Sequence, residues 1–288
     1  MRWTTGRRSE NIEDRRGQRV SRGVMVGGLG GLGTLVLVVL ALIFGVDPST
    51  LFQQGDAEPY SADESPADAP VASSPAEDQL KDFVSVVVAD TEDTWGSIFE
   101  RGGQRYSPPR LVLFRDAVRS ECGYAESTVG PFYCGADRKV YLDLSFMDEL
   151  RRRFRAPGDF AQAYVIAHEV GHHVQNLLGL SQQVQDAQAR MGREEANAVS
   201  VRYELQADCL AGVWANRAKR RDILESGDLE EALGAATAIG DDRIQRETRG
   251  YVVPDSFTHG TSAQRVHWFR TGLTEGAVEA CDTFRSSR

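Results

Sequence analysis

The sequence lacks the features of a nucleic-acid binder and of a cysteine-rich metal protein. Its 33 Lys and Arg are outnumbered by 42 Asp and Glu, and the formal net charge of -9 argues against nucleic acid as a partner. Only four cysteines are present and none forms a C-x-x-C pair, which argues against a zinc site built from cysteines. No internal repeat is detectable, which excludes a solenoid.

Charged side chains are also missing from Val24 to Val46, the longest uncharged apolar stretch of the chain. A helix of that length spans roughly 34 Å, enough to cross a bilayer with some tilt. A secretory signal peptide is the alternative, but its apolar region is normally shorter, and no clear A-x-A cleavage site follows. We therefore predict a transmembrane helix over residues 24–46.

The flanking segments differ strongly in charge. Residues 1–23 hold seven Arg against three acids, and the positive-inside rule places such a segment in the cytoplasm. Residues 47–80 hold eight acids, five of the ten prolines and no Lys or Arg, which predicts a disordered tether over 47–79. The prediction is a single-pass membrane protein whose domain, residues 80–288, is extracytoplasmic.

The sequence pattern predicts an α+β domain in which short strands precede a mainly helical part. A helix is expected around residues 80–100 and strands at RLVLF and KVYLDL, with a compact loop between Cys122 and Cys134. The stretch SFMDELRRRF is predicted to be helical, and from Asp159 onward helices dominate.

The segment VIAHEVGHHVQNLLG contains the pattern H-E-x-x-H at His168, Glu169 and His172. On a helix, two histidines four residues apart share one face and can bind one metal ion. Gly171 between them weakens the helix, so we expect another segment to approach closely at that position. The pattern is typical of a zinc site in which the glutamate is a general base.

Local signals place this pattern on a helix. The sequence PGD predicts a helix that starts at Asp159 as N-cap, with Gln162 completing a capping box and Gly179 as the C′ residue. His173 points away from the ligand face and is predicted to be structural. A second helix is predicted to begin after Gly192.

Hydrolytic zinc usually has three protein ligands, so a third must come from elsewhere in the chain. The longer histidine motif would need Gly at 175 and His at 178, which are Gln175 and Leu178. In VRYELQADCLAGVWA, Glu204 and Asp208 share one helix face among apolar residues, where buried carboxylates need a cationic partner. We predict Glu204 as the third ligand and Asp208 as the acceptor that orients a ligand histidine, with the reverse assignment as the alternative.

An even number of cysteines in an exported domain favours disulfides, and three pairings are possible. We favour Cys122 with Cys134, because they are close in sequence and glycines let the intervening chain turn. Cys209 is then left with Cys281, and free buried cysteines are the alternative.

These segments, together with PFYCGADRKVYLDLSFMDEL, FTHGTSAQRVHWFRTG and the opening MRW…RRSENIEDRRG, resemble the bacterial family of neutral zinc metallopeptidases. The spacing of Glu204 and Asp208 is similar to that of gluzincin peptidases. The resemblance implies a zincin-like domain, mainly helical with a small sheet, preceded by one transmembrane helix in the bacterial cell membrane. It implies Zn²⁺ as cofactor and a peptide or protein as substrate.

The implied mechanism is metal-assisted hydrolysis. Zinc held by His168, His172 and Glu204 would activate water, and Glu169 would take its proton. KVYLDL, if an edge strand, could pair with an extended substrate, and a core strand is the alternative. A zinc-stabilised binding or scaffold protein without turnover is the second function class, and a peptidoglycan hydrolase the third.

FTHGTSAQR is a loop-like segment that offers one further candidate, His259. We predict that His259 donates a hydrogen bond to the oxyanion, with Arg265 as an alternative donor. The competing interpretation is that His259 caps its loop and Arg265 pairs with a surface acid.

Overall fold

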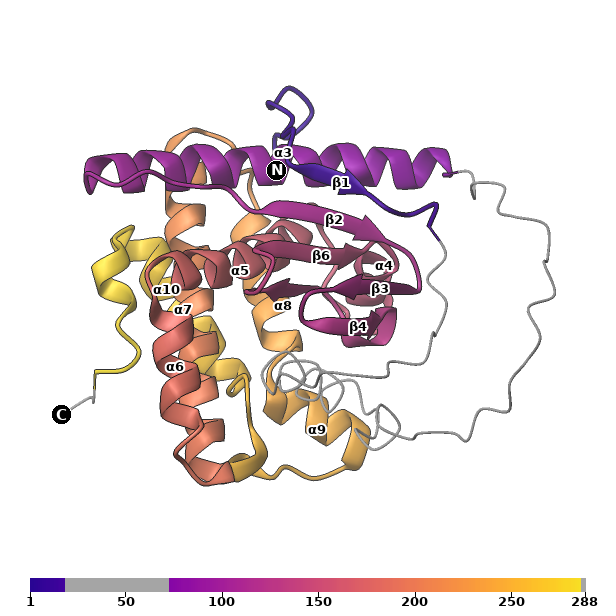
Figure 1. Ribbon diagram of the computed structural model, residues 1–288. Helices are drawn as coiled ribbons and strands as arrows, with labels where there is room; N and C mark the ends of the chain where they lie inside the picture. The colour runs from indigo at the N-terminus through magenta and orange to yellow at the C-terminus, as the bar shows by residue number, and fades with distance from the viewer. Residues whose placement is uncertain (19–72, 286–288) are drawn as a thin grey trace.

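A computed structural model describes residues 1–18 and 73–285 of the chain. This part is mainly helical and contains two small sheets. The long helix α3 (Pro75–Arg101) runs along one border of the molecule beside strand β1 (Figure 1). It begins with a capping box: the Glu77 amide donates to the Ser74 hydroxyl, and the Ser74 amide donates to the Glu77 carboxylate.

The larger sheet has the strand order β1-β2-β6-β5. Strands β1 (Ile12–Asp14), β2 (Arg110–Phe114) and β6 (Lys139–Asp143) are mutually parallel, whereas β5 (Phe132–Cys134) pairs antiparallel with β6. Both predicted strands are confirmed, but KVYLDL lies inside the sheet, and the edge strand on that side is β5. Parallel strands buried on both faces read as continuous apolar runs, which is why β6 shows no edge signature.

The stretch between Cys122 and Cys134 is more ordered than the predicted loop. It contains β4 (Gly123–Glu126), which forms a hairpin with β3 (Ala117–Ser120), followed by the short helix η1 (Ser127–Val129) and β5. A disulfide joins Cys122 to Cys134, and another joins Cys209 to Cys281, 72 residues away along the chain. Both predicted pairings are confirmed.

Helices form the rest of the described chain. After α4 (Ser145–Arg152) come α5 (Asp159–Leu177), α6 (Leu180–Gln188), α7 (Arg193–Arg220), α8 (Asp228–Ala238), α9 (Asp241–Arg249), η2 (Pro254–Ser256), α10 (Ser262–Glu275) and η3 (Val278–Cys281). The main core contains residues of α3, β2, β6, α5, α7, α8 and α10. Helix α5 is buried along most of its length, so its polar residues need partners inside the protein.

The start of α5 differs from the prediction. Gly158, with φ of 117°, is the N-cap, and no capping box forms. The Phe160 amide donates instead to Glu231 of α8, while the Asp159 carboxylate accepts from the amino group of Met1. The other end is as predicted, because Gly179 follows the helix in the left-handed conformation, with φ of 76°.

The N-terminal residues are part of the same folded unit. Strand β1 pairs with β2, Trp3 packs edge-on against Phe83, and Met1 is buried in the main core. Arg8 pairs with Asp82 of α3 at 2.6 Å. The N-terminal segment therefore contributes a strand to the sheet of the domain.

This arrangement corrects the predicted topology. A single span would place the N-terminal segment and the domain on opposite sides of a membrane, whereas β1 and β2 are hydrogen-bonded in one sheet. Among residues 1–18 and 73–285, no helix is long and apolar enough to cross a bilayer. The fold class with a preceding transmembrane helix and the membrane localisation are therefore contradicted.

Two of the predicted segments fall wholly or partly outside the described residues. The proposed span, residues 24–46, lies outside the described residues. So does the proposed tether as far as residue 72, and α3 begins at Pro75, within the range assigned to the tether.

Candidate metal centre

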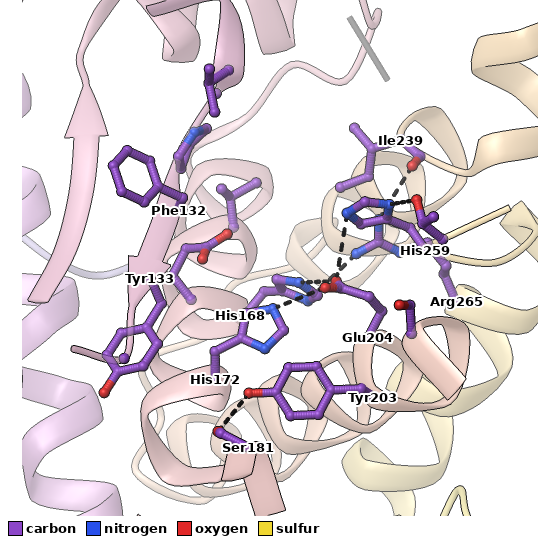
Figure 2. Close-up of a pocket in the computed structure, with 18 of the residues that line it drawn as sticks. Phe132, Tyr133, His168, His172, Ser181, Tyr203, Glu204, Ile239, His259 and Arg265 are labelled. Atoms are coloured by element: carbon purple, nitrogen blue, oxygen red, sulfur yellow. Dashed lines mark hydrogen bonds and ion pairs between the residues drawn. The ribbon is translucent and has the colours of Figure 1, made fainter. Parts of the chain in front are cut away.

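Three predicted ligands from two helices converge at one point. His168 and His172 project from the same face of α5, and Glu204 reaches them from α7 (Figure 2). The Nε2 atom of His168 lies 3.1 Å from Glu204 Oε2, and that of His172 lies 3.5 Å from Glu204 Oε1. One ligand atom from each residue lies within 4.8 Å of the others, a grouping that suits a metal ion.

Close packing of α5 on α7 brings these residues together. A Cβ atom added to Gly171 would lie 3.0 Å from the Ala207 carbonyl oxygen and 3.2 Å from Ala207 Cα. The small residue at position 171 therefore allows the close approach that its place between the two histidines predicts. His168 and Glu204 lie three residues before Gly171 and Ala207 in their helices, and His172 directly follows Gly171.

Asp208 lies behind His168 and is fully buried. Its Oδ1 atom is 2.9 Å from His168 Nδ1, and both its oxygens accept from the Arg265 guanidinium at 2.9 Å. Burial alone would raise the pKa of Asp208, but Arg265 and His168 outweigh it and lower the pKa to about 2. The Asp208 carboxylate therefore lies where it can orient His168, as predicted, while Glu204 faces the Nε2 atoms of His168 and His172.

Nearby charges shift the pKa values of His168 and Glu204. Burial favours neutral His168, yet the Asp208 carboxylate outweighs it and raises the pKa of His168 to about 10, so a metal would displace a proton there. Burial favours protonated Glu204, but His172 and His259 outweigh it and hold its pKa well below the usual range. Without a metal, the ionised Glu204 therefore faces a protonated His168, and a bound cation would take the place of that proton.

His172 has a neutral partner that the sequence reasoning did not identify. Its Nδ1 atom lies 2.8 Å from Gln175 Oε1, and the Gln175 amide donates to the Tyr203 carbonyl and to Gln206. Gln175 is fully buried. The sequence signal that could have identified Gln175 is its position three residues after His172, on the same face of the helix.

Glu169 and His173 occupy the neighbouring faces of α5. Glu169 is buried and lines the same cavity as the ligands; burial raises its pKa, and His168 and His172 only partly offset that effect. His173 bonds to Tyr133 and to the Ser107 carbonyl, away from the ligands. The structural prediction for His173 is confirmed.

His259 enters the same site from the loop before α10. Its Nε2 atom is 3.9 Å from Glu204 Oε2, and its Nδ1 atom is 3.7 Å from Asp241 Oδ1. Asp241 Oδ2 accepts from the backbone amides of Thr258, His259 and Gly260 at 2.7–3.0 Å, which fixes the loop. Although burial opposes it, Glu204 and Asp241 raise the pKa of His259.

Arg265 is not at the surface. It is 2% exposed, its Nε and Nη2 atoms donate to Asp208, and Nη1 donates to the Ile239 carbonyl. The interpretation that it pairs with a surface acid is wrong. Its observed contacts support the orientation of His168 through Asp208.

The centre lies in a cavity of about 200 Å³. Gly130, Pro131, Phe132 and Tyr133, in and just before edge strand β5, contribute to its wall. Strand β5, the edge strand of the larger sheet among the described residues, therefore borders the cavity.

The donor set fits zinc. Two imidazole nitrogens and one carboxylate oxygen are the ligands of many hydrolytic zinc sites, and the outer contacts of both histidines are present. A second acidic group, Asp159, Asp228 and Glu231, surrounds the Met1 amino group, which pairs with Asp159 at 2.7 Å and Asp228 at 3.3 Å. A protein cation, the Met1 amino group, therefore already pairs with two of these three acids.

Known proteins place the chain in a family. It is 49% identical over 295 residues to the uncharacterized protein YpfJ of Escherichia coli K12, with all of both chains covered. It is 41% identical over 216 residues to the uncharacterized protein Rv2575 of Mycobacterium tuberculosis H37Rv, covering 71% of this chain and 72% of that one. No solved structure matches. A family model matches residues 1–284, and the chain therefore belongs to the family described as "Putative neutral zinc metallopeptidase".

Proposed function

We propose that this chain is a zinc-dependent peptidase that hydrolyses peptide bonds. The observation that carries the proposal is the convergence of His168, His172 and Glu204 on one cavity that also contains the buried carboxyl group of Glu169. A structural zinc site needs no general base and usually has four protein ligands. A three-ligand group beside a free carboxyl group is the arrangement of a hydrolytic site.

Zinc bound there would supply Lewis acidity, which activates water and stabilises negative charge on a carbonyl oxygen. Glu169 follows His168 directly and lies about 100° around the helix, so its carboxylate faces the cavity without joining the ligands. It takes a proton from the attacking water and delivers that proton to the leaving amine. Asp208 and Gln175 hold the two histidines in the required tautomer.

Edge strand β5 is the element suited to bind the substrate backbone. Its outer edge has no strand partner in the described sheet, and its residues line the cavity. An extended peptide can add to such an edge through main-chain hydrogen bonds. We therefore assign to β5 the substrate-pairing role that the sequence suggested for KVYLDL.

His259 is the proposed donor to the oxyanion that forms when water attacks the carbonyl. It is buried in the cavity wall with Nε2 directed toward Glu204, on a loop fixed by Asp241 (Figure 2). His259→Ala should lower kcat about 100- to 1,000-fold and leave bound zinc unchanged. An unchanged kcat would eliminate the donor role.

Metal content and peptide cleavage, measured on the same preparations, test the function. Wild type and Glu169→Gln should each hold about one zinc per chain, whereas His168→Ala and Glu204→Ala should lose it. On a mixed peptide library read by mass spectrometry, Glu169→Gln should cut about 100- to 10,000-fold more slowly than wild type.

Different failures have different meanings. Zinc retained in Glu204→Ala but lost in Asp208→Ala would reverse the ligand assignment. Stoichiometric zinc without cleavage of any peptide or protein would favour the binding or scaffold alternative. Equal cleavage by wild type and Glu169→Gln would remove the general base from the mechanism.

A further inference from the structure

The cavity continues past the metal centre into an apolar wall. Its members come from α4 and the turn after it, from α5, from the residue that follows α8, and from α9: Phe146, Phe154, Val165, Ile239 and Ile244. Four of them belong to the main core and are at most 5% exposed, and the partly buried Ile239 packs against it. Val165 lies one turn before His168 on α5, so this wall begins directly beside the first ligand.

The opposite end of the cavity has a different character. There most of the residues from α6 and α7 are polar and uncharged, with Val184 and Tyr203 beside them: Ser181, Gln185, Gln188 and Ser200. In Figure 2, Ser181 and Ile239 lie on opposite sides of the His168–His172–Glu204 group. The metal centre therefore separates an apolar end from a polar end.

Charge is confined to the centre itself. Among the described residues that line the cavity, the acidic and basic ones are Glu169, Glu204, Arg265 and the three histidines of the centre, His168, His172 and His259. Arg265 is already paired with Asp208. A charged substrate side chain placed against the apolar wall would lose its hydration without gaining an ion pair, which is costly.

We infer that the apolar wall is a specificity site for one large, uncharged apolar side chain, aromatic or branched aliphatic, of the residue at the scissile bond. The inference rests on the proposed function and names the substrate class of that site. The whole cavity, metal centre included, measures about 200 Å³. For comparison, a cavity of roughly 150 Å³ lined by aliphatic and aromatic groups is enough for benzene.

Cleavage of matched peptides provides the first test. A series identical except at the residues flanking the scissile bond would carry Phe, Leu, Ala, Lys or Asp there. Phe and Leu should exceed Ala in kcat/KM by at least about tenfold at one flanking position, with Lys and Asp poorer still. Equal values at both positions would overturn the inference while leaving the proposed peptidase intact.

Ile239→Glu tests the wall directly. Ile239 is only half-buried, and its hydrogen bonds are made by its main chain. Its side chain can therefore be replaced by another of similar volume. The variant should lose the preference for Phe and gain relative activity on Lys. Gln185→Glu, which adds the same charge at the polar end, is the control and should keep the preference for Phe. If Ile239→Glu fails to fold, Ile239→Ala should still reduce the ratio of Leu to Ala several-fold.

Peptide binding can be measured without cleavage, so it tests the specificity site separately from the proposed activity. The Glu169→Gln protein, loaded with zinc, is titrated with the same peptides, and Kd is measured by calorimetry. Phe and Leu peptides should bind at least about tenfold more tightly than Lys or Asp peptides even if no cleavage is ever seen. Indifferent binding would overturn the specificity site, whereas selective binding without cleavage by wild type would overturn only the proposed function.

Discussion

At the scale of single residues, the two ligand histidines are held by partners of different charge. His168 contacts the carboxylate of Asp208, whose own charge is balanced by Arg265. His172 contacts the neutral amide of Gln175. A carboxylate makes an imidazole more basic, whereas an amide oxygen fixes its tautomer with little added charge. The two ligands are therefore oriented equally well but differ in electron donation.

Gln175→Leu should weaken zinc binding by about 10- to 100-fold, because His172 loses the acceptor that fixes its tautomer and ring orientation. Competition with a chelator measures the affinity. Gln175→Glu restores an acceptor and should recover part of it, while Gln182→Leu, at an exposed position of the next helix, should change nothing. Wild-type affinity in Gln175→Leu would show that His172 needs no such partner.

At the scale of secondary-structure elements, the crossing of α7 and α10 depends on two glycines. A Cβ atom on Gly272 would lie 1.9 Å from the Cys209 carbonyl oxygen, and one on Gly212 would lie 2.1 Å from the Phe269 carbonyl oxygen. Backbones that approach this closely leave no space for a side chain. The crossing sets the distance at which Arg265 of α10 reaches Asp208 of α7.

Gly272→Ala should destabilise the protein by about 3 kcal/mol, because the added methyl group forces the two backbones apart. Urea unfolding followed by circular dichroism measures the change. Gly96→Ala on α3 is the matched control: nothing lies within 4 Å of its added Cβ, so the higher helix propensity of alanine should stabilise by up to about 1 kcal/mol. Equal effects of the two substitutions would contradict the packing argument.

At the scale of the whole molecule, the N-terminal residues connect the larger sheet to α5, the helix that carries His168 and His172. Strand β1 extends the sheet beside β2, while the Met1 amino group reaches Asp159 at the start of α5 and Asp228 at the start of α8. Segments more than 150 residues apart in sequence thus meet at the end of the helix that carries His168 and His172. The N-terminal segment and the helix that carries the proposed zinc ligands therefore belong to one folded unit.

Deleting residues 1–18 should lower the free energy of unfolding by at least about 2 kcal/mol, since burial of Met1 alone is worth that much. The deletion also leaves Asp159 and Asp228 without their cation. Thermal unfolding measures the loss, and a synthetic peptide of residues 1–18 added in trans should recover part of it. Arg2→Ala, whose side chain is 53% exposed, should change stability by less than about 0.5 kcal/mol. An unchanged melting temperature after deletion would contradict the integration of this segment.

Local sequence determined the parts of the site that lie within one helix or one short loop. The four-residue spacing of His168 and His172 and that of Glu204 and Asp208 follow from the helical period, and two glycines mark where α5 ends and where α7 begins. Proximity along the chain was sufficient to pair Cys122 with Cys134, which left Cys209 for Cys281. Such features depend on neighbouring residues, so the pattern of the sequence contains them.

Only the tertiary structure decided which distant segments meet. Asp241 reaches the loop of His259, Arg265 reaches Asp208 across 57 positions, and β1 joins a sheet whose next strand begins at Arg110. No local pattern distinguishes the edge strand β5 from the inner strand β6, because strand order results from packing of the whole chain. The charge pattern of residues 1–23 likewise resembled a cytoplasmic flank, yet several of its arginines have acidic partners on α3. Ion pairs between remote segments form only once the fold brings them together, and for that reason the sequence alone misplaced this segment.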